Sequence, residues 1–91
     1  MIKGKTSTGF SFSIDDDAKD DYDLFNAFNR VQDGQVEALD EAVTLLLGDK
    51  QKDKLRAHCK GKSGRVLASK MFKEVEEIIN IIGQSNDELK N

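Results

Sequence analysis

The 91-residue chain contains no proline, no tryptophan and a single cysteine, Cys59. Without proline, no residue lacks a backbone N–H or clashes with the preceding turn, so helices need not kink for that reason. One cysteine cannot form a disulfide within the chain, which is typical of a reducing compartment. These absences argue against a small disulfide-stapled secreted protein and favour helical structure.

Long apolar segments are also missing. The apolar runs are a few residues long, such as 45–47, whereas a helix that crosses a bilayer needs roughly 20 apolar residues. Residues 1–6 lack the apolar centre of a secretory signal. The formal net charge of -3 gives the protein no general attraction to nucleic acid or to an anionic membrane. We therefore expect a cytoplasmic protein without membrane contact.

The composition is that of a small globular domain, with 37% hydrophobic and 34% charged residues. Residues 10–14 alternate apolar and polar side chains and follow a Ser/Thr/Gly cluster, as strands after a turn do. This pattern predicts a β-hairpin over about residues 2–14. Phe10, Phe12 and Ile14 are expected on the one face that packs against helices.

Helical spacing dominates the rest of the chain. Apolar residues recur at intervals of three and four after the aspartate-rich run 15–23. The spacing predicts about four short helices, over about 16–32, 35–47, 49–60 and 66–83. The predicted fold class is therefore α+β, predominantly α. We expect a single domain over residues 1–83 and a disordered tail over 84–91.

Six aspartates lie between positions 15 and 23 and invite comparison with a calcium loop. A loop of the EF-hand kind needs glycine at its sixth position and glutamate at its twelfth. Counted from Asp15, those positions hold Asp20 and Asn26, so the motif fails. We interpret the run as helix-capping and solvated charge, and predict no metal site.

Two fragments begin to match catalytic or nucleotide-binding motifs without completing them. Residues 61–63 read Gly-Lys-Ser, the end of a phosphate-binding loop, but Arg56 stands where that motif has its first glycine. His58 and Cys59 are neighbours and point about 100° apart on a helix, which suits a nucleophile and its base poorly. We predict no catalytic residues, no cofactor and no enzymatic activity. Cys59 is expected to behave as a small buried apolar residue.

A basic stretch runs from Lys50 to Arg65 and contains seven lysines and arginines. Such residues can contact phosphates. The acidic net charge, the lack of interleaved aromatic residues and the absence of a recognition-helix pattern argue against nucleic acid as a partner. A small nucleic-acid-associated regulator nevertheless remains an alternative function. In another interpretation the stretch faces the acidic run 15–23, within the fold or on a neighbouring molecule.

The last predicted helix has a wide apolar stripe that allows two interpretations. It is either a core helix surrounded by the other elements, or a helix whose stripe stays partly open as a groove for a partner's apolar segment. Under the second interpretation, the partner-binding residues are Phe28, Leu45, Met71, Phe72, Val75, Ile78, Ile79 and Ile82.

Several segments together resemble small proteins of phages and prophages of Gram-positive bacteria. These segments are residues 1–6, Gly9-Phe10 with the alternating strand, residues 43–48 before a Lys-rich helix, and the loop 62–66. The resemblance extends to about Ile82, and such proteins are usually assigned as tail assembly chaperones of long-tailed phages (siphophages). This chain departs from their pattern at Leu67-Ala68, where a proline is expected, and at Cys59, where another residue type is commoner.

The resemblance implies a non-catalytic protein binder. Such chaperones bind the long helical tape measure protein, help the major tail protein to assemble around it, and are absent from the finished virion. The implied location is the cytoplasm of the bacterial host, and a homo-oligomer is left open. A structural tail completion protein is a further alternative, which differs in being part of the purified particle.

Overall fold

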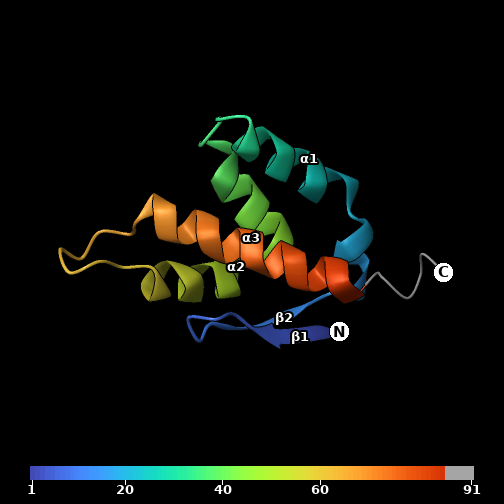
Figure 1. Cartoon of the computed structure of the whole chain (residues 1–91), viewed down its shortest axis with the longest axis horizontal. Coiled ribbons are helices and arrows are strands. Elements are labelled where there is room, and N and C mark those ends of the chain that lie inside the picture. The colour runs from blue at the N-terminus through green and yellow to red at the C-terminus, as the bar shows by residue number, and fades with distance from the viewer. Residues whose placement is uncertain (86–91) are drawn as a thin grey trace.

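The computed structural model describes residues 1–85. Its elements are the strands β1 (Ile2–Lys5) and β2 (Ser11–Ile14), the 3₁₀ helix η1 (Asp16–Asp20), and the helices α1 (Tyr22–Gln32), α2 (Ala38–His58) and α3 (Ala68–Ser85). The predicted α+β, predominantly α class is confirmed (Figure 1).

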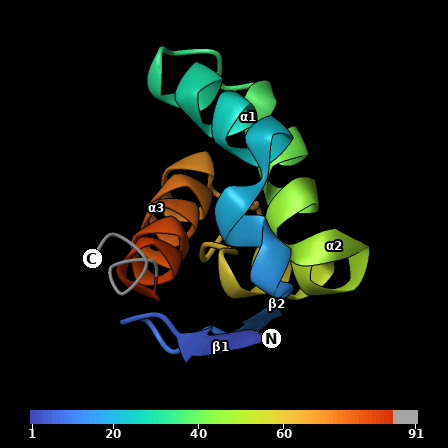
Figure 2. The same cartoon turned by 90° about the vertical axis from the view of Figure 1, so that its right-hand side faces the viewer.

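The elements form three layers in a molecule that measures 47 × 27 × 20 Å. α2 and α3 lie side by side in the middle, with α1 on one side of them and the β-hairpin on the other (Figures 1 and 2). β2 contacts α2, and β1 contacts α3. α3 therefore packs against both α2 and the hairpin.

The hairpin has the predicted position and the predicted buried face. Its strands pair antiparallel, with Ile2 opposite Ile14 and Gly4 opposite Phe12. Phe10, Phe12 and Ile14 are all buried. Because an isolated two-stranded hairpin is only marginally stable in water, the apolar area that these side chains bury against the helices is what stabilises it.

The predicted helix over 16–32 is two successive elements, η1 and α1. The carboxylate of Asp15 accepts a hydrogen bond from the N–H of Asp17 at 3.3 Å, and that of Asp21 accepts one from the N–H of Leu24 at 3.1 Å. Asp21 has an extended backbone (φ -86°, ψ 108°), which ends η1 before α1 begins. Helix capping by aspartate is confirmed, but it starts two helices rather than one.

The predicted helices over 35–47 and 49–60 are the two helical segments of α2, which meet at a kink, so the predicted break is confirmed and the count of four becomes three. Gly48 has φ 79° and ψ 167° inside α2, where the helix kinks. This conformation is essentially restricted to glycine. The predicted boundary at Gly48 is therefore a kink, because the backbone returns to helix directly after it without a loop.

The predicted helix over 66–83 is α3, displaced by two residues to 68–85. Val66 pairs with Lys60 in an isolated antiparallel bridge, which delays the start of the helix. Residues 84 and 85 of the predicted tail thus belong to α3. Residues 86–91 of that tail lie outside the described residues.

The hairpin and all three α-helices contribute to one contiguous hydrophobic core. Its largest fully buried side chains include Ile14, Leu24, Leu55, Ile78 and Ile82. Within residues 1–85, no helix combines the length and the apolar character needed to cross a membrane.

Candidate protein-binding site

The eight predicted partner-binding residues do not share one surface. Met71, Val75, Ile78 and Ile82 are buried in the core, with exposed fractions of 7%, 0%, 0% and 1%. Val75, Ile78 and Ile82 cannot meet a partner without opening the fold, whereas Met71 lines a hollow at the surface. For Val75, Ile78 and Ile82 the core interpretation of the stripe is correct, because α2 and the hairpin pack against α3.

The other four residues differ in exposure. Phe28, Phe72 and Ile79 are half-buried, and Leu45 is 37% exposed. The rings of Phe28 and Phe72 stack with their centroids 6.5 Å apart and their planes inclined by 20°. This pair joins α1 to α3, so its main contact is within the fold.

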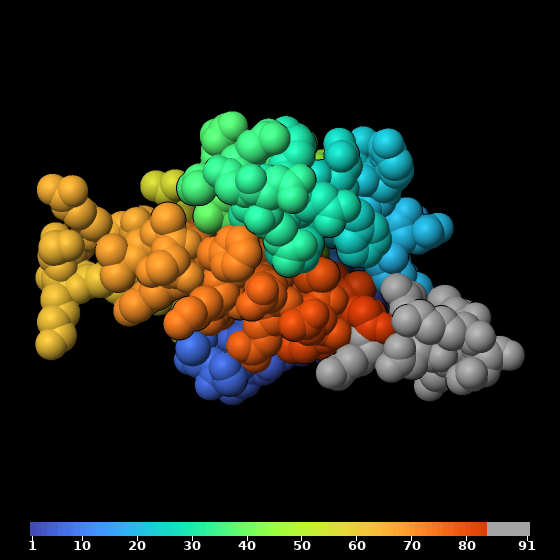
Figure 3. Space-filling model, turned by 45° about the horizontal axis from the view of Figure 1, so that its top comes forward, coloured from blue at the N-terminus to red at the C-terminus, as the bar shows by residue number. Residues whose placement is uncertain are grey.

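An apolar groove lies where α1, α2 and α3 meet. One hollow of about 340 Å³ is lined by Val31, Val36, Leu39, Ala68, Ser69 and Phe72. A second hollow of about 360 Å³ shares Val36 and Leu39 and adds Glu37, Asp40, Arg56, Val66 and Met71. We call the two hollows together the apolar groove. It adjoins the α1–α2 connection, which faces the start of α3 in Figure 3.

Val36 makes this groove unusual, because it is 58% exposed among otherwise buried apolar neighbours such as Val31 and Leu39. The N–H of Leu39 donates to the carbonyl of Val36 at 2.9 Å, so Val36 lies in the first turn that leads into α2. Val36 falls within the predicted helix over 35–47 but precedes α2, which begins at Ala38.

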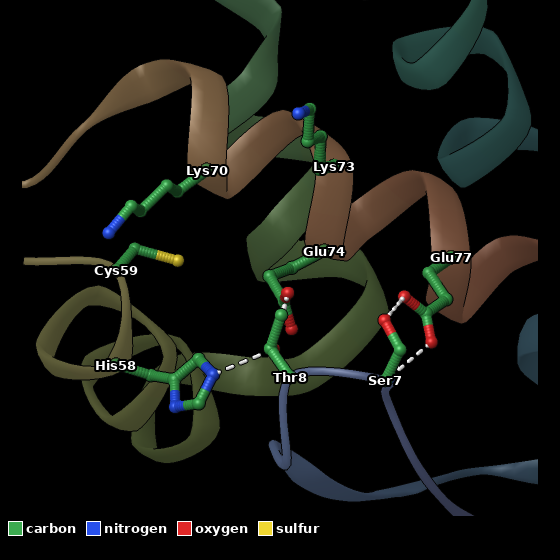
Figure 4. Close-up of a pocket in the computed structure, with 8 residues that line it drawn as sticks. All are labelled: Ser7, Thr8, His58, Cys59, Lys70, Lys73, Glu74 and Glu77. Atoms are coloured by element: carbon green, nitrogen blue, oxygen red, sulfur yellow. Dashed lines mark hydrogen bonds between the residues drawn. The ribbon is translucent and has the colours of Figure 1, made fainter.

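A third hollow, of about 340 Å³, lies between the hairpin turn, the end of α2 and α3 (Figure 4). We call it the polar hollow; it is lined by Ser7, Thr8, His58, Cys59, Lys70, Lys73, Glu74 and Glu77. It brings together the two side chains, His58 and Cys59, that were considered for catalysis and rejected.

A buried carboxylate organises the polar hollow. Glu74 is 4% exposed, and its two oxygens accept hydrogen bonds from the hydroxyls of Thr6 at 2.8 Å and Thr8 at 2.7 Å. A hydroxyl has one proton, so Thr8 acts as acceptor toward Nε2 of His58, 2.9 Å away. Glu74 therefore holds the hairpin turn against α3, and His58 adds a hydrogen bond from the end of α2.

These contacts differ from those of a nucleophile and its base. In such a pair the imidazole takes the hydroxyl proton and a carboxylate orients the imidazole. Here the proton of Thr8 points to Glu74, and His58 donates to Thr8. Glu77 is used similarly to Glu74, since it accepts hydrogen bonds from the N–H and the hydroxyl of Ser7. The arrangement is suited to holding the turn in place.

The thiol of Cys59 is 1% exposed, which confirms the predicted burial. Burial raises the pKa of the Cys59 thiol, the charge of Glu74 raises it further, and Lys70 opposes the shift. The thiol is thus protonated at neutral pH, which makes it a weak nucleophile and metal ligand. Across residues 1–85, no group of three or more His, Cys, Asp or Glu side chains is placed to hold a metal ion.

Comparisons with protein-family models, curated proteins and solved structures give no match to this chain. The candidate site is therefore argued from its geometry. On that basis the apolar groove is the stronger candidate, because Ser7, Thr8, His58, Glu74 and Glu77 of the polar hollow already hydrogen-bond within the fold.

The proposed pairing of the basic stretch with the acidic run is not found within the molecule. Lys52 pairs with Asp40 at 3.2 Å, and Asp16 pairs with the N-terminal amino group of Met1 at 3.2 Å. Between residues 50–65 and 15–23, both fully described, there is no ion pair. The intramolecular form of this prediction is wrong.

Proposed function

We propose that this chain is a non-catalytic protein binder that acts as a phage tail assembly chaperone, holding an apolar helical segment of the tape measure protein while the tail tube assembles. The observation that carries protein binding is the apolar groove with the 58% exposed side chain of Val36 in both of its hollows. The resemblance to tail assembly chaperones of Gram-positive siphophages is the reason for proposing the tape measure protein as the partner.

The groove offers two adjoining hollows to a partner. Its two hollows have similar volumes, about 340 and 360 Å³, and meet at Val36 and Leu39. An amphipathic helix presents apolar side chains one turn apart, and these are the natural anchors for two adjoining hollows. Covering apolar surface that water would otherwise contact supplies the affinity. Glu37, Asp40 and Arg56 lie at the second hollow and are placed to meet polar residues beside the anchors.

The proposal has a consequence for location. A chaperone of this kind acts in the cytoplasm of the bacterial host and leaves the tail before the particle is complete. Mass spectrometry of purified particles should therefore lack its peptides. Their presence in stoichiometric amount would instead support the structural alternative, a tail completion protein.

The decisive experiment is co-expression of this chain with the tape measure protein encoded in the same genome. The wild-type chain should raise the soluble fraction of the client and co-elute with it on gel filtration. Val36→Lys places a charge in the groove and should abolish co-elution, because a buried unpaired ammonium is costly.

Leu45→Lys is the matched control, since Leu45 is also exposed, at 37%, and lines neither hollow of the groove. Both substitutions change the net charge by the same amount. The proposal fails if the wild-type chain forms no complex with the client, and the groove is excluded as the binding site if the two variants behave alike.

A further inference from the structure

The charge of this chain is strongly segregated. Residues 54–73 contain seven lysines and arginines and no aspartate or glutamate. The rest of the chain holds the other seven basic residues and all 17 acidic ones, so that the small net charge of -3 conceals a stretch of +7 and a remainder of -10.

The fold gathers this stretch at one end of the molecule. It comprises the end of α2, the α2–α3 connection and the start of α3, which lie together at the left end of the long axis in Figure 1. The connection projects furthest and is tied at its base by the bridge between Lys60 and Val66. The N–H of Gly61 also donates to the carbonyl of Arg65 at 2.9 Å. We call residues 54–73 the basic end and residues 60–66 the finger.

The cations of the basic end are exposed and unpaired. All seven side chains belong to exposed residues: Lys54, Arg56, Lys60, Lys62, Arg65, Lys70 and Lys73. The three ion pairs found among residues 1–85 involve other basic groups, namely the N-terminus, Arg30 and Lys52. These cations are therefore free to be neutralised by a partner.

We infer that the basic end binds the phosphate backbone of a double-stranded nucleic acid without reading its sequence. A duplex presents one negative charge per about 1.7 Å of axis, and each cation that neutralises a phosphate releases a counterion. The acidic net charge argued against such binding when the sequence was considered as a whole. The tertiary structure removes that objection, because three consecutive segments converge on one end.

The side chains of the basic end favour a duplex over two other polyanionic partners, a single strand and an anionic membrane. Single strands are held by aromatic side chains on which bases stack. Residues 54–73 contain two such rings: Phe72 is half-buried and packs against Phe28, and the ring of His58 packs against Phe10 with centroids 5.6 Å apart. Anionic membranes are held by apolar side chains that insert beside the charges. The large exposed apolar side chains of the described residues are Met1, Tyr22, Val36 and Leu45, none of which belongs to residues 54–73. Val36 lies beside the basic end, in a hollow that Arg56 and Val66 also line, so vesicles are included in the test below.

The test is fluorescence anisotropy of a labelled duplex of about 30 base pairs and arbitrary sequence, titrated with the full chain at several salt concentrations. Binding should weaken steeply with salt. Lys62→Gln with Arg65→Gln removes two charges from the finger, and should weaken binding about tenfold or more at about 50 mM salt and make the slope shallower by about two. Both side chains are exposed, so the fold is expected to survive.

The matched control is Lys3→Gln with Lys5→Gln, which changes the net charge equally but lies in β1. It should bind the duplex like the wild-type chain. Equal losses in both double variants would assign the effect to overall charge and overturn the inference. Binding to a single strand or to phosphatidylglycerol vesicles in preference to the duplex would overturn it too, as would low-salt self-association without duplex binding. The groove variant Val36→Lys should keep duplex binding, which separates this inference from the proposed function.

Discussion

At the scale of single residues, Glu74 joins parts of the chain that are 68 positions apart. It is a buried carboxylate with two hydroxyl partners, Thr6 and Thr8. Hydrogen bonds to a charged group are stronger than neutral ones, and leaving a buried partner unsatisfied is costly. The same turn is also held by Glu77 through Ser7, nearer the surface.

Glu74→Gln should therefore lower the free energy of unfolding by about 1–3 kcal/mol, because an amide offers one acceptor oxygen where the carboxylate offers two. Urea unfolding followed by circular dichroism measures the change. Glu77→Gln is the matched control, with an expected loss below about 1 kcal/mol since its contacts are exposed to solvent. Equal losses would show that burial of Glu74 has no special effect.

Cys59 should make stability depend on alkaline pH. Burial and the charge of Glu74 raise the pKa of the Cys59 thiol in the folded protein, and Lys70 opposes that shift. The folded state then holds the thiol proton more tightly than the unfolded state does. The protonated thiol thus contributes to the free energy of unfolding. This contribution is fully present below the ordinary thiol pKa of about 8.5 and is lost as the pH rises through the folded-state pKa.

Urea unfolding of the wild-type chain and of Cys59→Ala, compared at neutral and alkaline pH, tests this expectation. The alanine variant is expected to be less stable at neutral pH, because it leaves a small cavity in the core. The difference in the free energy of unfolding between the wild-type chain and Cys59→Ala should become smaller as the pH rises above about 8.5. A difference that stays constant would contradict the raised pKa.

At the scale of elements, α2 depends on one backbone conformation. Gly48 has a positive φ of 79° with ψ 167°, and a Cβ added there would meet no atom within 4 Å. Any cost of a side chain at this position is therefore backbone strain and not a steric clash. Gly83 in α3 offers the opposite case, since it is helical and its added Cβ also meets nothing.

Gly48→Ala and Gly83→Ala should consequently change stability in opposite directions. The first should lower the free energy of unfolding by about 1–3 kcal/mol, because alanine does not tolerate that backbone conformation. The second should raise it by up to about 1 kcal/mol, because alanine is the better helix former. Thermal and urea unfolding of both variants measure the two changes. A stabilising Gly48→Ala would mean that α2 can straighten at no cost.

At the scale of the whole molecule, a single chain supplies its own core. Val75, Ile78 and Ile82 of α3 are covered by elements of the same chain. The surface of the molecule carries the apolar groove, the basic end that adjoins it, and the acidic residues of the rest of the chain. We therefore expect one copy to fold without a second copy.

The midpoint of thermal unfolding should thus be independent of protein concentration. For a protein whose fold depends on association, the midpoint rises with concentration by mass action. Differential scanning fluorimetry over about a hundredfold range of concentration distinguishes the two cases. A midpoint that rises steadily would show that part of the core is completed by another copy.

Features that depend on near neighbours in the chain were predictable from the sequence. The alternation of residues 10–14 placed the strand and its buried face, and the three- and four-residue spacing placed the helices within a few positions. Gly48 marked the break in α2 because its preference for unusual backbone angles is local. Local hydrogen bonding and side-chain periodicity determine these features.

Features that depend on distant parts of the chain were decided by the tertiary structure. The stripe of α3 became core because α2 and the hairpin pack against it, which no spacing within the helix can specify. The bonds from Thr6 and Thr8 to Glu74, the exposure of Val36 and the gathering of the basic end likewise arise from segments brought together by folding. Periodicity identifies a face, but only packing determines what covers that face.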